Sequence, residues 1–165
     1  MRLFYNIIIN LASVSVRFFG GLNKKINQGQ KGRNESIRVL KQIVGPSDKV
    51  IWLHCASLGE YEQGLPVFQA LKKQYKDHKF VMTFFSPSGY EIRKNNPIAD
   101  VVVYLPLDQK TAVNSFLDVT HPELVVFVKY DLWPNYLSEL KRRNIYTVLI
   151  SALFRPSQPY FKSYG

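Results

Sequence analysis

Short apolar runs alternate with longer segments of helical period between residues 50 and 150, and this alternation constrains the fold more than any other feature of the sequence. Each run is rich in β-branched or aromatic residues and nearly continuous in apolar character, which is typical of a strand buried on both faces of a parallel sheet. The expected strands are residues 50–54, 80–85, 101–105, 124–128 and 146–150. The expected helices are residues 34–44, 61–75, 90–94, 110–119 and 132–143. Five strands alternating with helices predict an α/β fold, a doubly wound parallel sheet with right-handed crossovers.

A chain of 165 residues has the size of one ordinary domain, and its 46% hydrophobic and 21% charged residues are typical of a globular protein. Cys55 is the single cysteine, so no internal disulfide can form. This composition excludes a disordered chain and a secreted disulfide scaffold, and it favours a reducing compartment such as the cytoplasm.

Basic residues are concentrated at the start of the chain. The formal net charge is +10, and residues 1–49 carry nine Lys or Arg against two acids. This excess favours an anionic partner, such as a phospholipid surface, a phosphorylated substrate or nucleic acid. A non-catalytic basic α/β module that binds nucleic acid or anionic lipid is therefore one interpretation. Nucleic acid is the less favoured partner, because the aromatic residues fall at positions expected to be buried and no recognition-helix or RNP-like pattern occurs.

Residues 3–16 form a mostly apolar segment. Its length of about 14 residues is short of the roughly 20 that a membrane-spanning helix needs, and Asn6 and Asn10 interrupt the apolar run that a signal peptide requires. Two interpretations remain open: a helix in the membrane interface, or a helix packed against the rest of the protein. In the first, basic side chains would lie near lipid phosphates, namely Arg17, Lys24, Lys25, Lys31 and Arg33.

Four glycines follow this segment and predict a flexible basic loop, at Gly20, Gly21, Gly29 and Gly32. We therefore expect a membrane-associated helix with a basic loop over residues 1–33, and an α/β domain over residues 34–165.

Ligands of doubly wound sheets bind outside the carboxyl ends of the strands. The segments that follow the expected strands are 55–60, 86–89, 106–108, 129–135 and 151–155. Polar residues, Gly and Pro gather in these segments. We expect the functional site on this one edge of the sheet.

The first of these segments belongs to the sequence HCASLGE and opens a long helix after a strand. Gly59 permits a tight turn, and the free N–H groups of the helix start attract anions. Glu60 has two interpretations: a general base that takes a proton from a bound hydroxyl, or a first-turn acid that complements the helix dipole. The sequence contains neither G-x-G-x-x-G nor a P-loop, so nothing in it favours binding of NAD or a P-loop nucleotide.

Two further segments carry polar side chains with more than one interpretation. Ser86 and Ser88, in SPSG, are suited to hold a phosphate or a sugar, or to cap the next helix. Lys129 and Asp131 follow a buried strand, either as binding residues or as an ion pair beside a core Trp133.

The three histidines are His54, His78 and His121, and they are too scattered to predict a metal site. No metal is therefore expected. His54 lies near the candidate edge and is a minor candidate contact, for which a structural role is favoured.

The segments occur in the order found in the N-terminal half of bacterial Kdo transferases, the 3-deoxy-D-manno-octulosonic-acid transferases of lipopolysaccharide assembly, and the sequence resembles that family. The resemblance rests on HCASLGE, on T-x-x-S-P-S-G at 83–89, on PLD at 106–108, on LWPN at 132–135 and on the strand end at 151–155. It covers most of residues 1–155. The combination of SLGE with LWPN is fairly specific, whereas each alone would be weak.

The resemblance implies a GT-B glycosyltransferase with two Rossmann-like domains, of which this chain is the N-terminal, acceptor-binding half. Such enzymes transfer Kdo from CMP-Kdo to a lipid A precursor, without a metal or other cofactor, at the cytoplasmic face of the inner membrane. The donor CMP-Kdo would bind a C-terminal domain that this chain lacks, so we expect no transfer by this chain alone. The basic residues of the first 49 positions would meet phospholipid and the phosphates of the lipid A precursor.

Site residues follow from the same resemblance. The acidic residue of the family's S-x-G-E motif, which is thought to deprotonate the acceptor hydroxyl, falls on Glu60. The expected substrate-binding residues at the two turns are Ser57, Gly59, Ser86, Ser88 and Gly89.

The sequence departs from the family pattern in two places. Many members have an acidic pair before Trp-Pro, whereas here the first acid is replaced by Lys129 and only Asp131 keeps its charge type. The Asn-Ala-Arg that follows the fifth strand in many members is absent, and Arg155 is the candidate for its cation. We include Lys129, Asp131 and Arg155 among the expected substrate-binding residues.

Overall fold

The computed structural model describes residues 2–19, 24–155, 158 and 161. Its centre is a parallel sheet of five strands, in the order β3-β2-β1-β4-β5. The strands are β1 (Lys49–Cys55), β2 (His78–Phe84), β3 (Val101–Tyr104), β4 (Leu124–Val128) and β5 (Tyr146–Ile150). The prediction of an α/β, doubly wound, Rossmann-like sheet is confirmed, with strand bounds that differ from those expected by at most two residues.

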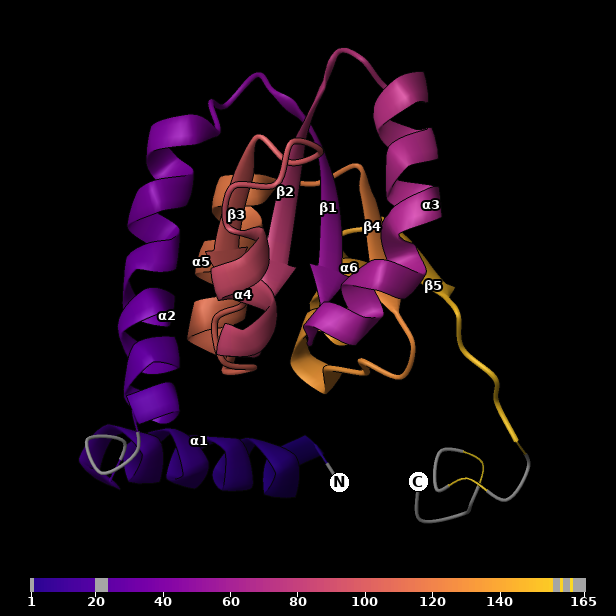
Figure 1. Ribbon diagram of the computed structural model, residues 1–165. Helices are drawn as coiled ribbons and strands as arrows, with labels where there is room; N and C mark the ends of the chain where they lie inside the picture. Colours follow the sequence, from indigo (N-terminus) through magenta and orange to yellow (C-terminus); the bar gives the residue numbers. More distant parts are fainter. Residues whose placement is uncertain (1, 20–23, 156–157, 159–160, 162–165) are drawn as a thin grey trace.

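Six helices surround the sheet in the described part of the chain: α1 (Arg2–Phe19), α2 (Lys24–Ile43), α3 (Leu58–Gln74), α4 (Pro87–Arg93), α5 (Lys110–Thr120) and α6 (Pro134–Arg142). Helices α3 and α4 cover one face, and α2, α5 and α6 cover the other (Figure 1). This division follows from right-handed crossovers, because the chain moves outward from β1 to β3 and then returns to β4 and β5.

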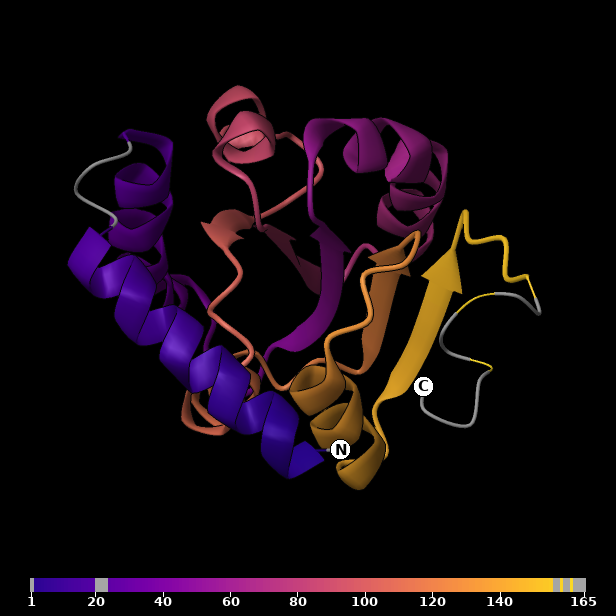
Figure 2. The ribbon, with the colours of Figure 1, turned by 90° about the horizontal axis from the view of Figure 1, so that it is seen from below.

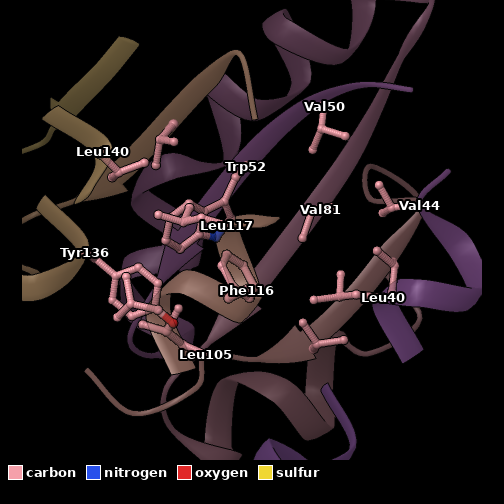
Figure 3. Close-up of a cluster of buried hydrophobic side chains, with 14 of the residues drawn as sticks. Leu40, Val44, Val50, Trp52, Val81, Leu105, Phe116, Leu117, Tyr136 and Leu140 are labelled. Atoms are coloured by element: carbon pink, nitrogen blue, oxygen red, sulfur yellow. The ribbon is translucent and has the colours of Figure 1, made fainter. Parts of the chain in front are cut away.

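The two faces of β1 supply two separate cores, since alternate side chains of a strand point to opposite faces. Ile51 and Leu53 pack under α3 and α4, whereas Trp52 packs under α5 and α6. The centroid of the Trp52 ring system lies 4.8 Å from that of Phe116 and 5.4 Å from that of Tyr136. Figure 3 shows these three side chains within the cluster. These cores fix the strand ends from which the candidate site is built.

The expected loop through Gly29 and Gly32 is wrong, because both residues lie within α2, which begins ten residues earlier than predicted. A Cβ atom at Gly32 would lie 2.2 Å from the ring of Tyr104. The glycine therefore allows α2 to approach β3 closely, and the residue type that indicated a loop serves helix packing instead. Helix α2 runs through the expected domain boundary at residues 33 and 34, and Gly20 and Gly21 lie outside the described residues.

Helix α1 lies across the end of the sheet to which the strands point (Figures 1 and 2). Tyr5 Oη donates a hydrogen bond to Asp108 Oδ2 at 2.7 Å, and Asn135 Nδ2 donates to Asn6 Oδ1 at 2.8 Å. Farther along the helix, Gln109 Nε2 donates to Asn10 Oδ1 at 2.8 Å and to Ser13 Oγ at 2.9 Å. The polar side of this helix therefore packs against the rest of the protein, as the second interpretation of the segment expected.

The other side of α1 is apolar and open. Among the side chains that the structure describes here, five large apolar ones are between 49% and 69% exposed: Phe4, Ile7, Ile8, Leu11 and Val14. None of the helices in the described ranges is both long enough and apolar enough to cross a bilayer.

Candidate active site

The candidate site lies at the topological switch point of the sheet, between the neighbouring strands β1 and β4. Strand β1 pairs with both β2 and β4, and the chain leaves β1 toward one edge and β4 toward the other. Crevices at the carboxyl ends of such strands are where doubly wound folds bind ligands. The segment that ends in Glu60 follows β1, and the segment that contains Asp131 follows β4, so the reversal brings two of the expected segments together.

Glu60 is the third residue of α3 after the N-cap Ser57. Its Oε2 atom accepts hydrogen bonds from the backbone N–H of Ala56 at 2.5 Å and of Ser57 at 3.3 Å. This oxygen caps the helix, as the first-turn-acid interpretation expects. Among the described residues no donor reaches Oε1, so one oxygen of this partly buried carboxylate remains available to a ligand.

Burial and then the negative charge of Asp131 raise the pKa of Glu60 above its usual range. The two backbone hydrogen bonds act in the opposite direction, as would a positive charge on His54. The net result is a carboxylate that holds a proton more tightly than an exposed glutamate does. Such a group is a stronger base once it is ionised.

His54 is fully buried and links Asp131 to the sheet. Its Nε2 atom lies 2.6 Å from Asp131 Oδ2, and its Nδ1 atom lies 2.7 Å from Thr83 Oγ1. Thr83 Oγ1 also accepts a hydrogen bond from Trp52 Nε1 at 2.8 Å. The expected ion pair between Lys129 and Asp131 does not form, because Asp131 is paired with the histidine instead.

His54 has contacts at both ring nitrogens. Thr83 Oγ1 accepts a hydrogen bond from Trp52 Nε1 and shares another with Nδ1 of His54. On the other side of the ring, Nε2 is in close contact with Oδ2 of Asp131. His54 therefore holds the Asp131 carboxylate beside Glu60, a role that the sequence interpretation as a minor contact underestimated.

The SPSG turn lies next to the Glu60 turn. Ser86 is the N-cap of α4, and its backbone N–H donates to the carbonyl of Ala56 at 2.8 Å. Its Oγ atom accepts from the N–H of Ser88 at 3.3 Å and lies 2.9 Å from Ser88 Oγ. The capping interpretation therefore holds for Ser86, while the exposed Ser88 hydroxyl still faces outward at the same edge.

Two glycines of the site have different structural roles. A Cβ atom at Gly89 would lie 2.4 Å from the ring of Phe84 and 3.1 Å from the backbone nitrogen of Leu58, so this glycine allows α4 to pack closely. A Cβ atom at Gly59 would meet nothing within 4 Å, and no described glycine has a positive φ. The expected tight turn is therefore not the reason for Gly59, which instead leaves open space beside Glu60.

The remaining predicted residues are more distant from this group. Lys129 has a φ of 62° and closes β4 through its backbone N–H, which donates to the carbonyl of Ile150 at 2.8 Å. The exposed Arg155 lies beyond β5, and its backbone N–H donates to Gln158 Oε1 at 2.9 Å. No contact between described residues joins either side chain to Glu60.

Two of the sequence motifs bind each other. Asp108, from PLD, accepts hydrogen bonds from the backbone N–H groups of Asn135 at 3.0 Å and of Tyr136 at 2.9 Å, at the start of α6. Asn135, from LWPN, donates through Nδ2 to the carbonyl of Asp108. These motifs therefore hold α6 and α1 to the end of β3, and the sequence carried no signal for this pairing.

Arg33 is a residue at this edge that the sequence interpretation misplaced in a loop. It lies on α2, and its guanidinium donates through Nε to the carbonyl of Leu105 at 3.2 Å and through Nη2 to that of Phe85 at 2.6 Å. Its neighbours in sequence gave no signal of burial, because the two glycines before it indicated a loop. In the described part of the chain no three His, Cys, Asp or Glu side chains gather as metal ligands.

Comparison with known proteins identifies the family of the chain. Residues 26–164 match the family described as 3-deoxy-D-manno-octulosonic-acid transferase (kdotransferase). A 3-deoxy-D-manno-octulosonic acid transferase of Chlamydophila psittaci is 31% identical over 134 residues, which are 79% of this chain and 31% of that protein. The protein of the same name from Haemophilus influenzae is 33% identical over 109 residues, 65% of this chain and 25% of that protein.

A third relative of the same name, from Aquifex aeolicus, is 31% identical over 88 residues, 53% of this chain and 24% of that protein. The matches thus span between about a quarter and a third of the length of these relatives. The matched region includes Glu60, His54 and Asp131 together with the whole sheet. The chain therefore belongs to the Kdo transferase family, in which it corresponds to the N-terminal domain.

Proposed function

We propose that these 165 residues are the acceptor-binding half of an inverting, metal-independent glycosyltransferase that transfers Kdo from CMP-Kdo to a lipid A precursor. The observation that carries this proposal is Glu60: its pKa is raised, one of its oxygens is available, and it lies at the topological switch point. The relatives are 3-deoxy-D-manno-octulosonic acid transferases, which supports Kdo as the group transferred. CMP-Kdo would be held by sequence outside these residues, and no further cofactor is required.

In the proposed reaction the acceptor hydroxyl lies against Oε1 of Glu60. The carboxylate takes the hydroxyl proton as the oxygen attacks the anomeric carbon of Kdo, and the bond from that carbon to the CMP phosphate breaks. CMP leaves with the bonding electron pair, and attack from the opposite side inverts the anomeric centre. Proton removal by a positioned base contributes typically about 10²- to 10⁴-fold to such a rate.

The neighbouring residues have supporting roles in this proposal. The negative charge of Asp131, which lies against His54, helps to keep the pKa of Glu60 raised. The hydroxyls of Ser57 and Ser88 are available for the acceptor sugar, and Gly59 leaves the space that the sugar needs. Ser86 and Gly89 shape the second turn, and Lys129 and Arg155 would add positive charge at the far side of the edge.

We also place the protein at the cytoplasmic face of the inner membrane. Support comes from α1, whose polar side chains bond to the domain while its apolar side chains face outward. An apolar helix face flanked by basic residues is typical of interfacial binding. The exposed Lys24 and Lys31 at the start of α2 would then lie near lipid phosphates, while the side chain of Arg17 lies outside the described residues.

No observation favours the nucleic-acid alternative. Base stacking needs exposed aromatic rings beside basic residues. Most aromatic side chains of the sheet are instead buried, among them Trp52, Phe80, Phe84 and Phe127, and Tyr146 on the edge strand β5 is the exception.

A binding titration tests the proposal. The chain is titrated with the lipid A precursor in neutral detergent, with CMP-Kdo and with a random oligonucleotide at physiological salt. We expect saturable binding of the lipid only, retained in Glu60→Ala, because Glu60 acts in chemistry and adds little to holding the acceptor. Binding of the oligonucleotide without the lipid would contradict the proposal.

Catalysis is tested in an assembled enzyme. We define it as these 165 residues followed by the part of the Haemophilus influenzae relative that lies C-terminal to the region matched by this chain. We expect transfer of Kdo by the assembled enzyme and none by the 165 residues alone. Product formed by the 165 residues alone would contradict the assignment of the donor site to sequence outside them.

A further inference from the structure

Arg33 is a partly buried cation at the carboxyl edge of the sheet. Its side chain reaches from α2 to the residues directly after β2 and β3, where it donates to the carbonyls of Phe85 and Leu105. The centre of the guanidinium also lies 4.4 Å from the centroid of the Phe85 ring. Arg33 thus joins two strand ends, on the opposite side of the Phe85–Ser86 turn from Glu60.

The positive charge of Arg33 has no acidic partner in the described part of the chain. Burial lowers the pKa of Arg33, and the electrostatic interaction with the phenol of Tyr104 acts in the opposite direction. A guanidinium nevertheless stays protonated in proteins, so the charge remains. Two carbonyl oxygens leave several of its five N–H donors over, and the Nη1 atom has no hydrogen-bond partner among the described residues.

Arg33 lines a cavity of about 290 Å³ between α1, α2 and the segment from β3 to α5. Five polar side chains line it: Ser13, Gln30, Arg33, Asn34 and Gln109. The volume is many times the roughly 30 Å³ that a liquid water occupies and close to the lower end of ligand pockets. It is large enough for a phosphorylated sugar fragment.

Gln30 indicates what kind of ligand fits. It lines the cavity with an amide side chain, as Asn34 does. An amide can donate to or accept from a sugar hydroxyl, whereas a guanidinium binds an anion. A cation and two amides in the lining of one cavity match a phosphate ester on a sugar better than they match a free inorganic anion.

We propose that the cavity between α1 and α2 is an anion subsite, in which Arg33 binds a phosphate group on the sugar headgroup of the acceptor. The inference rests on the proposed function, because it takes the acceptor to be the phosphorylated lipid A precursor. The Phe85–Ser86 peptide lies between Arg33 and the Glu60 turn, because its carbonyl accepts from Arg33 and its N–H donates to the carbonyl of Ala56. In this proposal a headgroup bound by its phosphate presents a sugar hydroxyl toward Glu60. Helix α1, which contributes Ser13 and contacts Gln109, forms one wall and brings the membrane-facing side next to the headgroup.

The experiment compares two ligands and matched variants of the 165-residue chain. The ligands are the lipid A precursor and its enzymatically dephosphorylated form, each in micelles of a neutral detergent. Arg33→Gln removes the charge from the cavity, and Arg38→Gln removes the same charge from the exposed side of the same helix, where it pairs with Glu35. Ala112→Leu partly fills the cavity from α5 and leaves Arg33 in place.

We expect Arg33→Gln to weaken binding of the phosphorylated ligand about tenfold to a hundredfold, which is typical of a lost charge-assisted hydrogen bond. Binding of the dephosphorylated ligand should be unchanged, and Arg38→Gln should change neither by more than about twofold. Ala112→Leu should also weaken binding of the phosphorylated ligand, which keeps the test valid if Arg33→Gln lowers the Tm.

Four results would overturn the inference. Equal losses for both ligands would mean that Arg33 acts through the fold and not through phosphate. Arg33→Gln is also compared with the unchanged chain on vesicles of phosphatidylglycerol. Weaker binding of the variant to these vesicles, without weaker binding of the lipid A precursor, would assign the cavity to bilayer phospholipid. Equal binding of both ligands by the unchanged chain would refute the subsite alone, whereas binding of neither ligand would refute the proposed function with it.

Discussion

Two carboxylates at the same edge of the sheet, Glu60 and Asp108, differ in how fully they are hydrogen-bonded. Both have a pKa raised by burial. Asp108 is completely buried and uses both oxygens, with Tyr136 on Oδ1 and with Asn135 and Tyr5 on Oδ2. Glu60 is partly exposed and uses one oxygen. The direction of a pKa shift therefore does not separate a structural acid from a chemical one, whereas the number of unused acceptor atoms does.

The largest effect on stability is expected from Asp108→Ala. This change leaves two buried N–H groups at the start of α6 without an acceptor and removes the contact to Tyr5. A lost cap and unsatisfied buried donors should lower the free energy of unfolding by about 3 kcal/mol, which lowers the Tm by about 6–12 °C. Thermal unfolding followed by circular dichroism measures this, and Glu60→Ala is the matched control. An equal fall in Tm for both variants would contradict the distinction between Asp108 as a structural acid and Glu60 as a chemical one.

The next largest effect on stability is expected at Gly89, and the same substitution at Gly59 is the comparison. Gly89→Ala must displace Phe84 or α3 and should cost about 1–3 kcal/mol. Gly59→Ala meets open space, so its Tm should be unchanged or slightly higher, because alanine favours a helix. We expect weaker acceptor binding in Gly59→Ala alone. Denaturant unfolding and the acceptor titration measure the two quantities, and unchanged binding in Gly59→Ala would show that the ligand does not use this space.

Asp131→Asn tests how the environment of Glu60 is set. Removal of the Asp131 charge lowers the pKa of Glu60, because that charge is the second cause of its rise after burial. A general base acts when ionised, so the acidic limb of the pH–rate profile of the assembled enzyme should move to lower pH. The control is Asp118→Asn, which removes the same charge from an exposed pair with Arg143. An unmoved limb in Asp131→Asn would contradict the assignment of Glu60 as the base.

The smallest effect is expected at Glu139, a carboxylate on the outer side of α6. Arg142 hydrogen-bonds to it and lowers its pKa to about 2, with Arg143 adding to the effect. A lowered pKa stabilises the folded state above the unfolded value of about 4.3 and loses this contribution as the pH falls toward 2. Glu139→Gln should therefore lower the Tm by about 1–3 °C at pH 7. The difference should shrink as the pH falls from about 4.3 toward 2, and a Tm difference that grows on acidification would contradict this account.

The pattern of apolar runs predicted strands β1 to β4 because they are buried along most of their length, and burial is visible in local composition. It also predicted β5, although this edge strand contains no fully buried residue. The same pattern placed Glu60 and Asp131 on one edge, but it did not make β1 and β4 neighbours, since strand order depends on contacts between distant residues. Gly29 and Gly32 led to the wrong prediction of a loop. In a sequence, a glycine that allows a helix to pack closely cannot be told from one that ends a helix. The partners of Asp108, His54 and Arg33 are all distant in sequence, so their roles required the fold.

The most direct test of the central claim is a comparison of Glu60→Gln with Glu62→Gln in the assembled enzyme. Glu62 lies on the same helix and pairs with Arg93 at the surface, so its variant removes the same charge outside the site. The account predicts that Glu60→Gln lowers kcat by about 10²- to 10⁴-fold while the Kd for the acceptor and the Tm stay the same. It predicts no change in kcat for Glu62→Gln. A kcat for Glu60→Gln equal to that of the unchanged enzyme would contradict the account and leave Glu60 as a helix cap.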